Sequence, residues 1–187
     1  MKLGAVTRSF PELTNAETAA FLAEKELFYT ELCFSQTDSN YWVYNGRSDL
    51  GDMTDERAAG IVETYRSAGV EVSVLGVFTN LIDPDDEERS ANLDYFLRMI
   101  QIASHTGIPV AATECGFTPG RRGINADTYE EEFERLKASL AQLVAWGEEY
   151  GVDIALEACV LDVVPSAKRA RDLIAQVGSE RLKVLLD

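Results

Sequence analysis

A regular alternation of short apolar runs and longer amphipathic stretches is the feature that most constrains how this chain folds. The apolar runs predict six strands, over residues 3–6, 27–33, 70–77, 108–113, 153–157 and 182–186. The amphipathic stretches predict helices over residues 15–24, 55–68, 86–106 and 129–150, and a fifth helix that begins after Pro165. Because a helix separates each strand from the next, the order predicts a parallel sheet with helices packed on it.

Two parallel architectures fit this order. A doubly wound dinucleotide-binding sheet needs a glycine-rich turn after its first strand, whereas Thr7-Arg8-Ser9-Phe10 follows Val6 here. A (β/α)8 TIM barrel uses roughly 31 residues per unit, so 187 residues correspond to the first six units. We therefore predict one α/β TIM-barrel domain over residues 1–187, with an open six-stranded sheet as the alternative.

The same arithmetic predicts that the barrel is truncated at its C-terminus. Closing the ring takes about 60 further residues, or two more units. Without them the first and sixth strands expose unpaired backbone edges, which favour association into homo-oligomers. The isolated fragment is then expected to bind metal weakly and to show little activity.

Charge and composition exclude several classes of function. The chain has 17 Lys+Arg against 32 Asp+Glu, a net charge of −15 that repels nucleic acid and anionic membrane surfaces. No apolar run approaches the roughly 18 residues of a membrane span. The three cysteines lie far apart and form no zinc or redox motif, which favours a reducing, cytoplasmic compartment.

Polar residues gather where the predicted strands end, which is the ligand-binding side of a parallel α/β fold. Glu157 directly follows Ile154-Ala155-Leu156, and Asp187 follows Val184-Leu185-Leu186. Two carboxylates at the tips of neighbouring strands suit a divalent cation with oxygen ligands. Glu157 is thus the predicted catalytic and metal-binding residue, and Asp187 the second metal ligand.

Other residues at these ends are candidates for binding substrate. They are Arg8 after the first strand, Trp42 in the long loop 35–52, Asn80 after the third strand, Glu114 after the fourth, and Arg121 in the loop 119–123. Each has a structural alternative. Glu114 either faces the pocket or pairs with a basic residue, Arg121 either grips an anion or lies in a solvated turn, and Trp42 either stacks on a sugar or packs within its loop.

Several motifs resemble the sugar phosphate isomerase/epimerase family, the xylose-isomerase-like TIM barrels. They are LGVFTNL at 75–81, DPD at 83–85, ER at 88–89, ANL at 91–93, and TECG at 113–116, where relatives tend to have TETG. The residues IALE at 154–157 and VLLD at 184–187 match the metal-bearing ends of the fifth and sixth strands of that family. The resemblance covers nearly the whole chain.

This resemblance implies a metal-dependent isomerase or epimerase that acts on a sugar, sugar phosphate or cyclitol through an enediolate. In the family, Mn²⁺, Mg²⁺, Co²⁺ or Zn²⁺ is held by Glu, Asp, His and Glu on strands five to eight. Glu157 and Asp187 match the first two ligands, and we expect Glu157 also to move the proton on one face of the substrate. The sequence departs from the ketose 3-epimerases, which carry Asn and Arg shortly after the strand-five Glu, because Ala158, Cys159, Val160 and Leu161 stand there.

Two other functions remain open at this stage. A barrel that binds a sugar-like ligand without turnover predicts stabilisation by the ligand and no metal requirement. A lyase or dehydratase on the same scaffold is the other alternative, because abstraction of a proton beside a metal-bound carbonyl also permits loss of water. In all three readings the partner is a small carbohydrate and neither nucleic acid nor a membrane.

Overall fold

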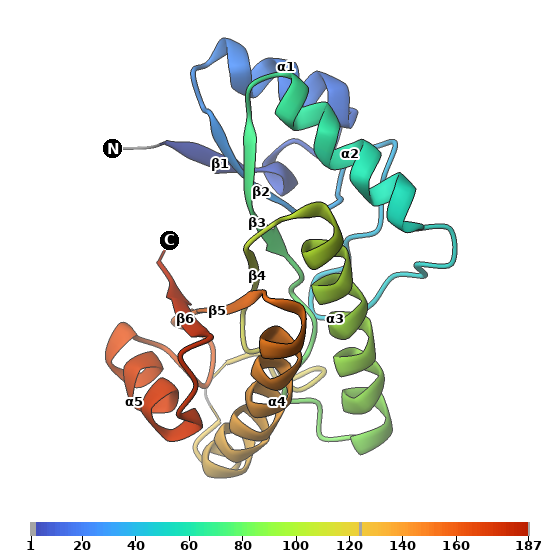
Figure 1. The fold of residues 1–187 in the computed structure, drawn as a ribbon. Helices are drawn as coiled ribbons and strands as arrows, with labels where there is room; N and C mark the ends of the chain where they lie inside the picture. The colour runs from blue at the N-terminus through green and yellow to red at the C-terminus, as the bar shows by residue number, and fades with distance from the viewer. Residues whose placement is uncertain (1–2, 124, 187) are drawn as a thin grey trace.

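The computed structural model describes residues 3–123 and 125–186, which form six parallel strands alternating with five α-helices (Figure 1). The strands are β1 (Gly4–Val6), β2 (Tyr29–Leu32), β3 (Glu71–Gly76), β4 (Val110–Thr113), β5 (Asp153–Glu157) and β6 (Leu182–Leu185). The helices are α1 (Asn15–Glu24), α2 (Asp55–Ser67), α3 (Asp86–Thr106), α4 (Tyr129–Tyr150) and α5 (Ala167–Val177). None of these helices is long and apolar enough to cross a membrane.

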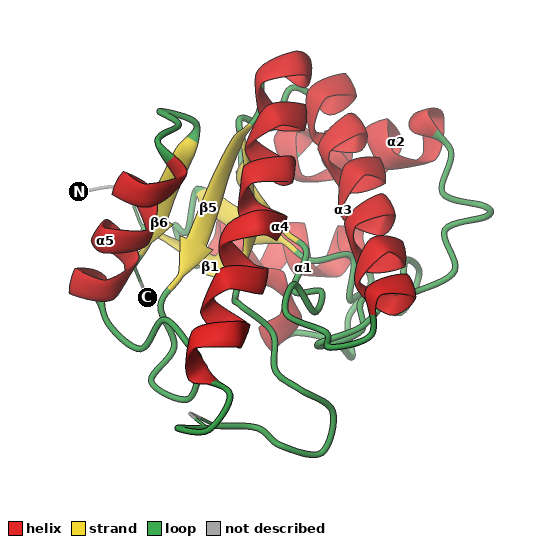
Figure 2. Ribbon diagram, turned by 90° about the horizontal axis from the view of Figure 1, so that it is seen from below, coloured by secondary structure: helices red, strands yellow, loops and turns green. Residues whose placement is uncertain are grey.

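The strands pair in sequence order, from β1 to β6, and β1 and β6 form the two edges of the sheet. Each strand is parallel to the next, with Ala5 opposite Thr30 at one end and Ala155 opposite Lys183 at the other. The sequential order is that of a TIM barrel, whereas a doubly wound sheet reverses its order at a switch point. The prediction of six consecutive β/α units is therefore confirmed. Figure 2 shows α4 beside β5 and α5 beside β6.

The strands are shorter than the sequence predicts, except for β5, whose bounds match. Val70, Val77 and Ile108 were predicted to lie in strands but flank them, although each is almost fully buried. Apolar side chains therefore stay buried beyond the last residues that pair in the sheet. The hydrophobic pattern of the sequence predicts this burial but not where strand pairing begins and ends. The residues after β1 form a short 3-10 helix, Thr7–Ser9, where the sequence predicts only a strand end.

Burial of alternate strand residues fixes which side chains face the helices. In β2, Thr30 and Leu32 are buried, whereas Tyr29 and Glu31 are partly exposed. The Thr30 hydroxyl donates to the carbonyl oxygen of Ala5 at 2.7 Å, so its burial leaves no unpaired donor. Because side chains alternate along a strand, the buried set commits Glu31 to the opposite face of the sheet.

Two glycines allow α4 to end close to β5 and the chain to turn from one into the other. Gly151 ends α4 with a left-handed φ of 73°, the conformation that glycine adopts readily at a helix C-cap. Gly147 lies inside α4, where an added Cβ would stand 2.5 Å from the carbonyl oxygen of Val152. The backbone of α4 thus approaches the strand that carries Glu157 more closely than any larger residue permits.

Gly147→Ala is expected to lower the free energy of unfolding by about 1–3 kcal/mol, because the clash is with backbone and overrides the helix preference of alanine. Gly60→Ala in α2 is the matched control, since nothing lies within 4 Å of its added Cβ. That variant should be more stable by about 0.5–1 kcal/mol. Urea denaturation of both variants measures the difference, and equal shifts would contradict the close approach.

Candidate functional site

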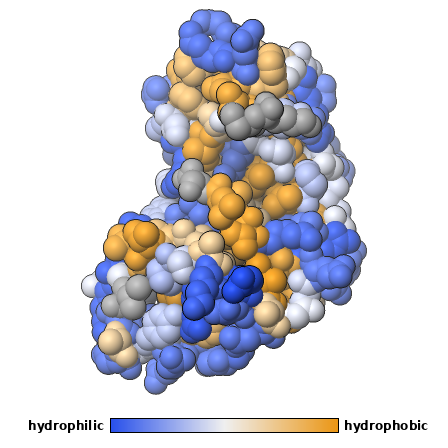
Figure 3. Space-filling view, turned by 90° about the vertical axis from the view of Figure 1, so that its left-hand side faces the viewer, coloured by the Kyte–Doolittle hydropathy of each residue, from blue (hydrophilic) through white to orange (hydrophobic). Residues whose placement is uncertain are grey.

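A cavity of about 540 Å³ lies at the open side of the curved sheet, between its two edges. Figure 3 views the molecule from this side, where hydrophobic side chains gather in the hollow between the upper and lower parts. The cavity is lined by parts of β1, β2, β3, β5 and β6, and by Arg8, Ser9 and Phe78 from the segments that follow β1 and β3. It combines apolar walls with a few charged groups, as small-molecule sites do.

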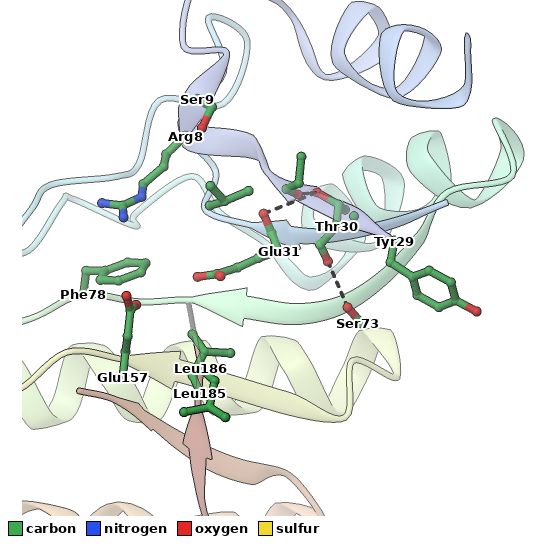
Figure 4. A pocket seen from close by; sticks show the side chains of 13 residues that line it. Arg8, Ser9, Tyr29, Thr30, Glu31, Ser73, Phe78, Glu157, Leu185 and Leu186 are labelled. Atoms are coloured by element: carbon green, nitrogen blue, oxygen red, sulfur yellow. Dashed lines mark hydrogen bonds between the residues drawn. The ribbon is translucent and has the colours of Figure 1, made fainter. Parts of the chain in front are cut away.

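Two carboxylates face this cavity, Glu31 from β2 and Glu157 from the end of β5. Figure 4 shows both pointing toward the ring of Phe78. The pairing of β2 with β3 shifts register between Thr30 and Glu31, and such irregularities re-aim side chains beside functional sites. Gly76 on β3 makes room for Glu31, because an added Cβ would clash with its Oε1 and lie 2.8 Å from the Phe78 ring.

A cation and two aromatic rings face these acids. The Arg8 guanidinium lies 4.8 Å from the ring centroid of Phe78 and 6.0 Å from that of Trp42. The two rings meet edge to face at 6.4 Å. Such contacts are attractive and hold a guanidinium without neutralising its charge. The 3-10 helix that follows β1 carries Arg8 to this position.

Phe78 has a left-handed backbone, with φ of 48°, and Phe34 has the same conformation at 50°. Each residue stands two positions after its strand, β3 or β2. This conformation costs a residue with a Cβ about 1–2 kcal/mol. The backbone N–H of Asn45 donates to the carbonyl oxygen of Phe78 at 2.9 Å and helps to hold the strained turn.

Cys33 is also close to Gly76, because its Sγ lies 2.8 Å from the position that a Cβ added to Gly76 would take. Burial raises the pKa of this thiol well above its usual value, and the negative charge of Glu31 raises it further. A neutral, buried thiol is a poor nucleophile and a poor metal ligand. Cys33 therefore fills space beside the cavity as a small apolar side chain.

A second polar cluster lies at the ends of β4 and β5. Glu114 is 8% exposed and accepts a hydrogen bond from the Tyr44 hydroxyl. The oxygen of that hydroxyl in turn accepts a hydrogen bond from Arg122 Nη2 at 2.8 Å. Asp162 is 2% exposed, and its Oδ2 accepts the backbone N–H of Cys115 at 3.2 Å. Burial raises the pKa of Asp162 to about 6, with a further contribution from the charge of Glu114.

The structure brings only some of the predicted site residues together. Arg8 and Glu157 line the cavity, and Trp42 borders it through its contact with Phe78. Asn80 is buried and donates to Asp83 at 2.9 Å, so its amide holds loops in place.

The remaining candidates lie elsewhere. Glu114 belongs to the second cluster and is tied to Tyr44. Arg121 is exposed and pairs with Asp127 at 3.0 Å, away from the residues that line the cavity. Asp187 lies outside the described residues.

The sequence did not indicate Glu31, Phe78 or Asp162 as site residues. Glu31 carried a usable signal, because an acid inside a predicted strand between threonine and leucine needs a polar environment. Asp162 carried none, because it lies near Glu114 in a loop whose path no periodicity describes.

The model of the xylose isomerase-like TIM barrel family matches residues 31–187. This chain belongs to that family. Among curated proteins, no relative is significantly similar in sequence.

Several solved structures have the same fold as this chain. E. coli YcjR, a 3-keto-D-glucoside 4-epimerase, superimposes with a TM-score of 0.77 at 13% identity, over 98% of this chain and 67% of its own. The D-psicose 3-epimerase of Clostridium cellulolyticum H10, solved with D-tagatose, gives 0.75 at 16% identity, over 98% and 62%. The IolI protein, solved with a bound zinc atom, gives 0.75 at 18% identity, over 100% and 63%. The chain thus spans about two-thirds of the length of these proteins.

The raised pKa of Asp162 predicts a pH-dependent cost to stability. Between its unfolded value and about 6, the folded chain binds more protons, so the free energy of unfolding falls as pH rises. Relative to Asp162→Asn, the wild type should lose up to about 3 kcal/mol between about pH 4 and pH 7. Urea denaturation across that range, with a chelator present, measures this difference.

The exposed Asp127→Asn variant is the control, expected to differ from wild type by less than about 0.5 kcal/mol throughout. A constant difference between wild type and Asp162→Asn would contradict the raised pKa.

Proposed function

We propose that this chain forms the substrate side of a sugar isomerase or epimerase that uses a divalent metal ion held at Glu157. The observation that carries the proposal is the position of Glu157, which ends β5 and faces the cavity together with Arg8 and Phe78. In a parallel α/β barrel, charged side chains at the carboxyl ends of strands form the active site.

The donor chemistry fits a divalent cation. Glu157 offers carboxylate oxygen, the ligand that Mn²⁺ and Mg²⁺ prefer and that Co²⁺ and Zn²⁺ accept. Asp187, which comes two residues after the end of β6 in the sequence, is the proposed second ligand. When bound, the ion polarises a carbonyl–hydroxyl pair of the substrate and makes the adjacent C–H bond more acidic.

The side chains of this chain supply binding and proton transfer. The Glu157 carboxylate takes and returns the proton at the carbon beside the substrate carbonyl. The Glu31 carboxylate accepts hydrogen bonds from substrate hydroxyls, and Arg8, from the segment after the neighbouring strand β1, donates to them across the cavity from Glu157. The rings of Trp42 and Phe78 form an apolar face on which the C–H side of a sugar ring packs.

The comparisons support a carbohydrate substrate, because the similar structures include epimerases of a keto-glucoside and of psicose. They also support a metal, because IolI was solved with zinc. These proteins share the fold at low sequence identity, so the substrate of this chain stays part of the proposal.

Glu157→Gln should lower proton exchange between substrate and solvent by about 10²–10⁴-fold, because glutamine neither takes up a proton nor ligates as a carboxylate. Deuterium incorporation into recovered substrate, over a panel of ketoses, aldoses and cyclitols with Mn²⁺, measures this. Glu63→Gln on the exposed face of α2 is the matched control and should exchange at the wild-type rate.

Three other outcomes of this experiment would each lead to a different conclusion. Exchange that survives Glu157→Gln or a chelator would overturn the proposal. Ligand-induced stabilisation without any exchange would favour a non-catalytic binding protein, and water loss detected by mass would favour a lyase or dehydratase.

Sugar binding should quench the fluorescence of Trp42, which borders the cavity, and leave that of Trp146 on α4 unchanged. Trp146→Phe should keep the response, while Trp42→Phe should lose it. Trp42→Ala should weaken binding by about 3–10-fold, since an aromatic contact contributes about 0.5–1.5 kcal/mol. A response that follows Trp146 instead would place the sugar elsewhere.

A further inference from the structure

A group of three potential metal ligands lies apart from the residues that line the cavity. Glu114, Cys159 and Asp162 each offer one carboxylate oxygen or sulfur atom, and these atoms lie within 4.8 Å of one another. Glu114 follows β4, and the other two follow β5. The cluster therefore joins two loops that are adjacent in the sheet but about 45 residues apart in sequence.

Asp162 gives independent reason to expect a ligand here. Its side chain is almost fully buried, and Oδ2 accepts the Cys115 N–H, whereas Oδ1 is buried and accepts no hydrogen bond from any described residue. A buried carboxylate oxygen without a partner costs free energy, because it has lost its hydration without replacement. A cation beside Oδ1 supplies that replacement.

Both carboxylates are already oriented by partners on their other oxygen. The Tyr44 hydroxyl donates to Oε2 of Glu114, and Tyr44 is itself held by Arg122 through a hydrogen bond and a cation–π contact at 5.2 Å. Such outer contacts fix ligand direction in metal sites. They occupy Oε2 of Glu114 and Oδ2 of Asp162, and each acid has a second oxygen with which it could bind an ion.

We propose that Glu114, Cys159 and Asp162 form a second divalent-cation site, separate from the one at Glu157 and suited to Zn²⁺ or Co²⁺. A thiolate with two carboxylates selects these ions over Mg²⁺, which prefers oxygen ligands alone. Ligand distances of about 2.0–2.3 Å require the three atoms to approach one another by about 1 Å. Cys159 stands in a loop and is partly exposed, so it gives the ion access and supplies this movement.

Coordination replaces the Cys159 S–H bond with a sulfur–metal bond, and the proton passes to solvent. The bound ion neutralises the repulsion between Glu114 and Asp162 and joins the loops that follow β4 and β5. Its expected role is to fix the loop that follows Glu157.

Thiol labelling with a disulfide reagent tests the site, because Cys33 and Cys115 are buried and Cys159 is the accessible thiol. Micromolar Zn²⁺ should slow the labelling of Cys159 in the whole chain by at least tenfold, and Mg²⁺ should not. Asp162→Asn and Glu114→Gln should lose this protection. Glu157→Gln should keep it, which distinguishes this site from the proposed catalytic metal.

Cobalt absorption gives a second readout that does not depend on labelling. Co²⁺ added to Glu157→Gln should produce a near-ultraviolet thiolate-to-cobalt band, and the further change Cys159→Ser, at a partly exposed residue, should remove it. Unprotected Cys159 with Zn²⁺ would overturn the proposal. So would protection that requires Glu157, or a band that persists without Cys159.

Discussion

The structure depends on the burial of one face of a parallel ladder against helices. Leu32 of β2 belongs to the buried core, so the preceding Glu31 faces the other way, and Glu157 likewise reaches the cavity after the core residue Leu156. The apolar side of each strand thus determines where its acid points. Packing of the opposite face sets the side on which each carboxylate lies, and for Glu31 the register shift after Thr30 and the missing side chain of Gly76 adjust its final position.

The fold was readable from the sequence because its signals are local. The side chains of Thr54 and Asp85 cap the N-termini of α2 and α3 by accepting hydrogen bonds from backbone N–H groups. Gly107 and Gly151 end α3 and α4 in the left-handed conformation that glycine favours. The strand order followed from unit length and from the absence of a glycine-rich first turn. The strand ends were extended too far, since burial continues where pairing stops, and the short 3-10 helix at Thr7–Ser9 was not predicted.

The site was readable only in part, because its residues meet across the sheet. Glu157 and Arg8 follow strands directly, so their placement at the cavity followed from the architecture. Arg121 lies one position before Arg122, yet it pairs with Asp127 while Arg122 turns to Tyr44. The conformation of a loop decides between two such neighbours, and neither charge nor spacing encodes it.

The left-handed turn at Phe78 combines a backbone cost with a packing gain. Glycine adopts that backbone without strain, whereas it costs a residue with a Cβ about 1–2 kcal/mol. Burial offsets this cost, because the Phe78 side chain is only 2% exposed and burying a ring of this size contributes about 1.5–3 kcal/mol. Glycine at this position would relax the turn but remove the ring beneath the Arg8 guanidinium, so the strain and the contact persist together.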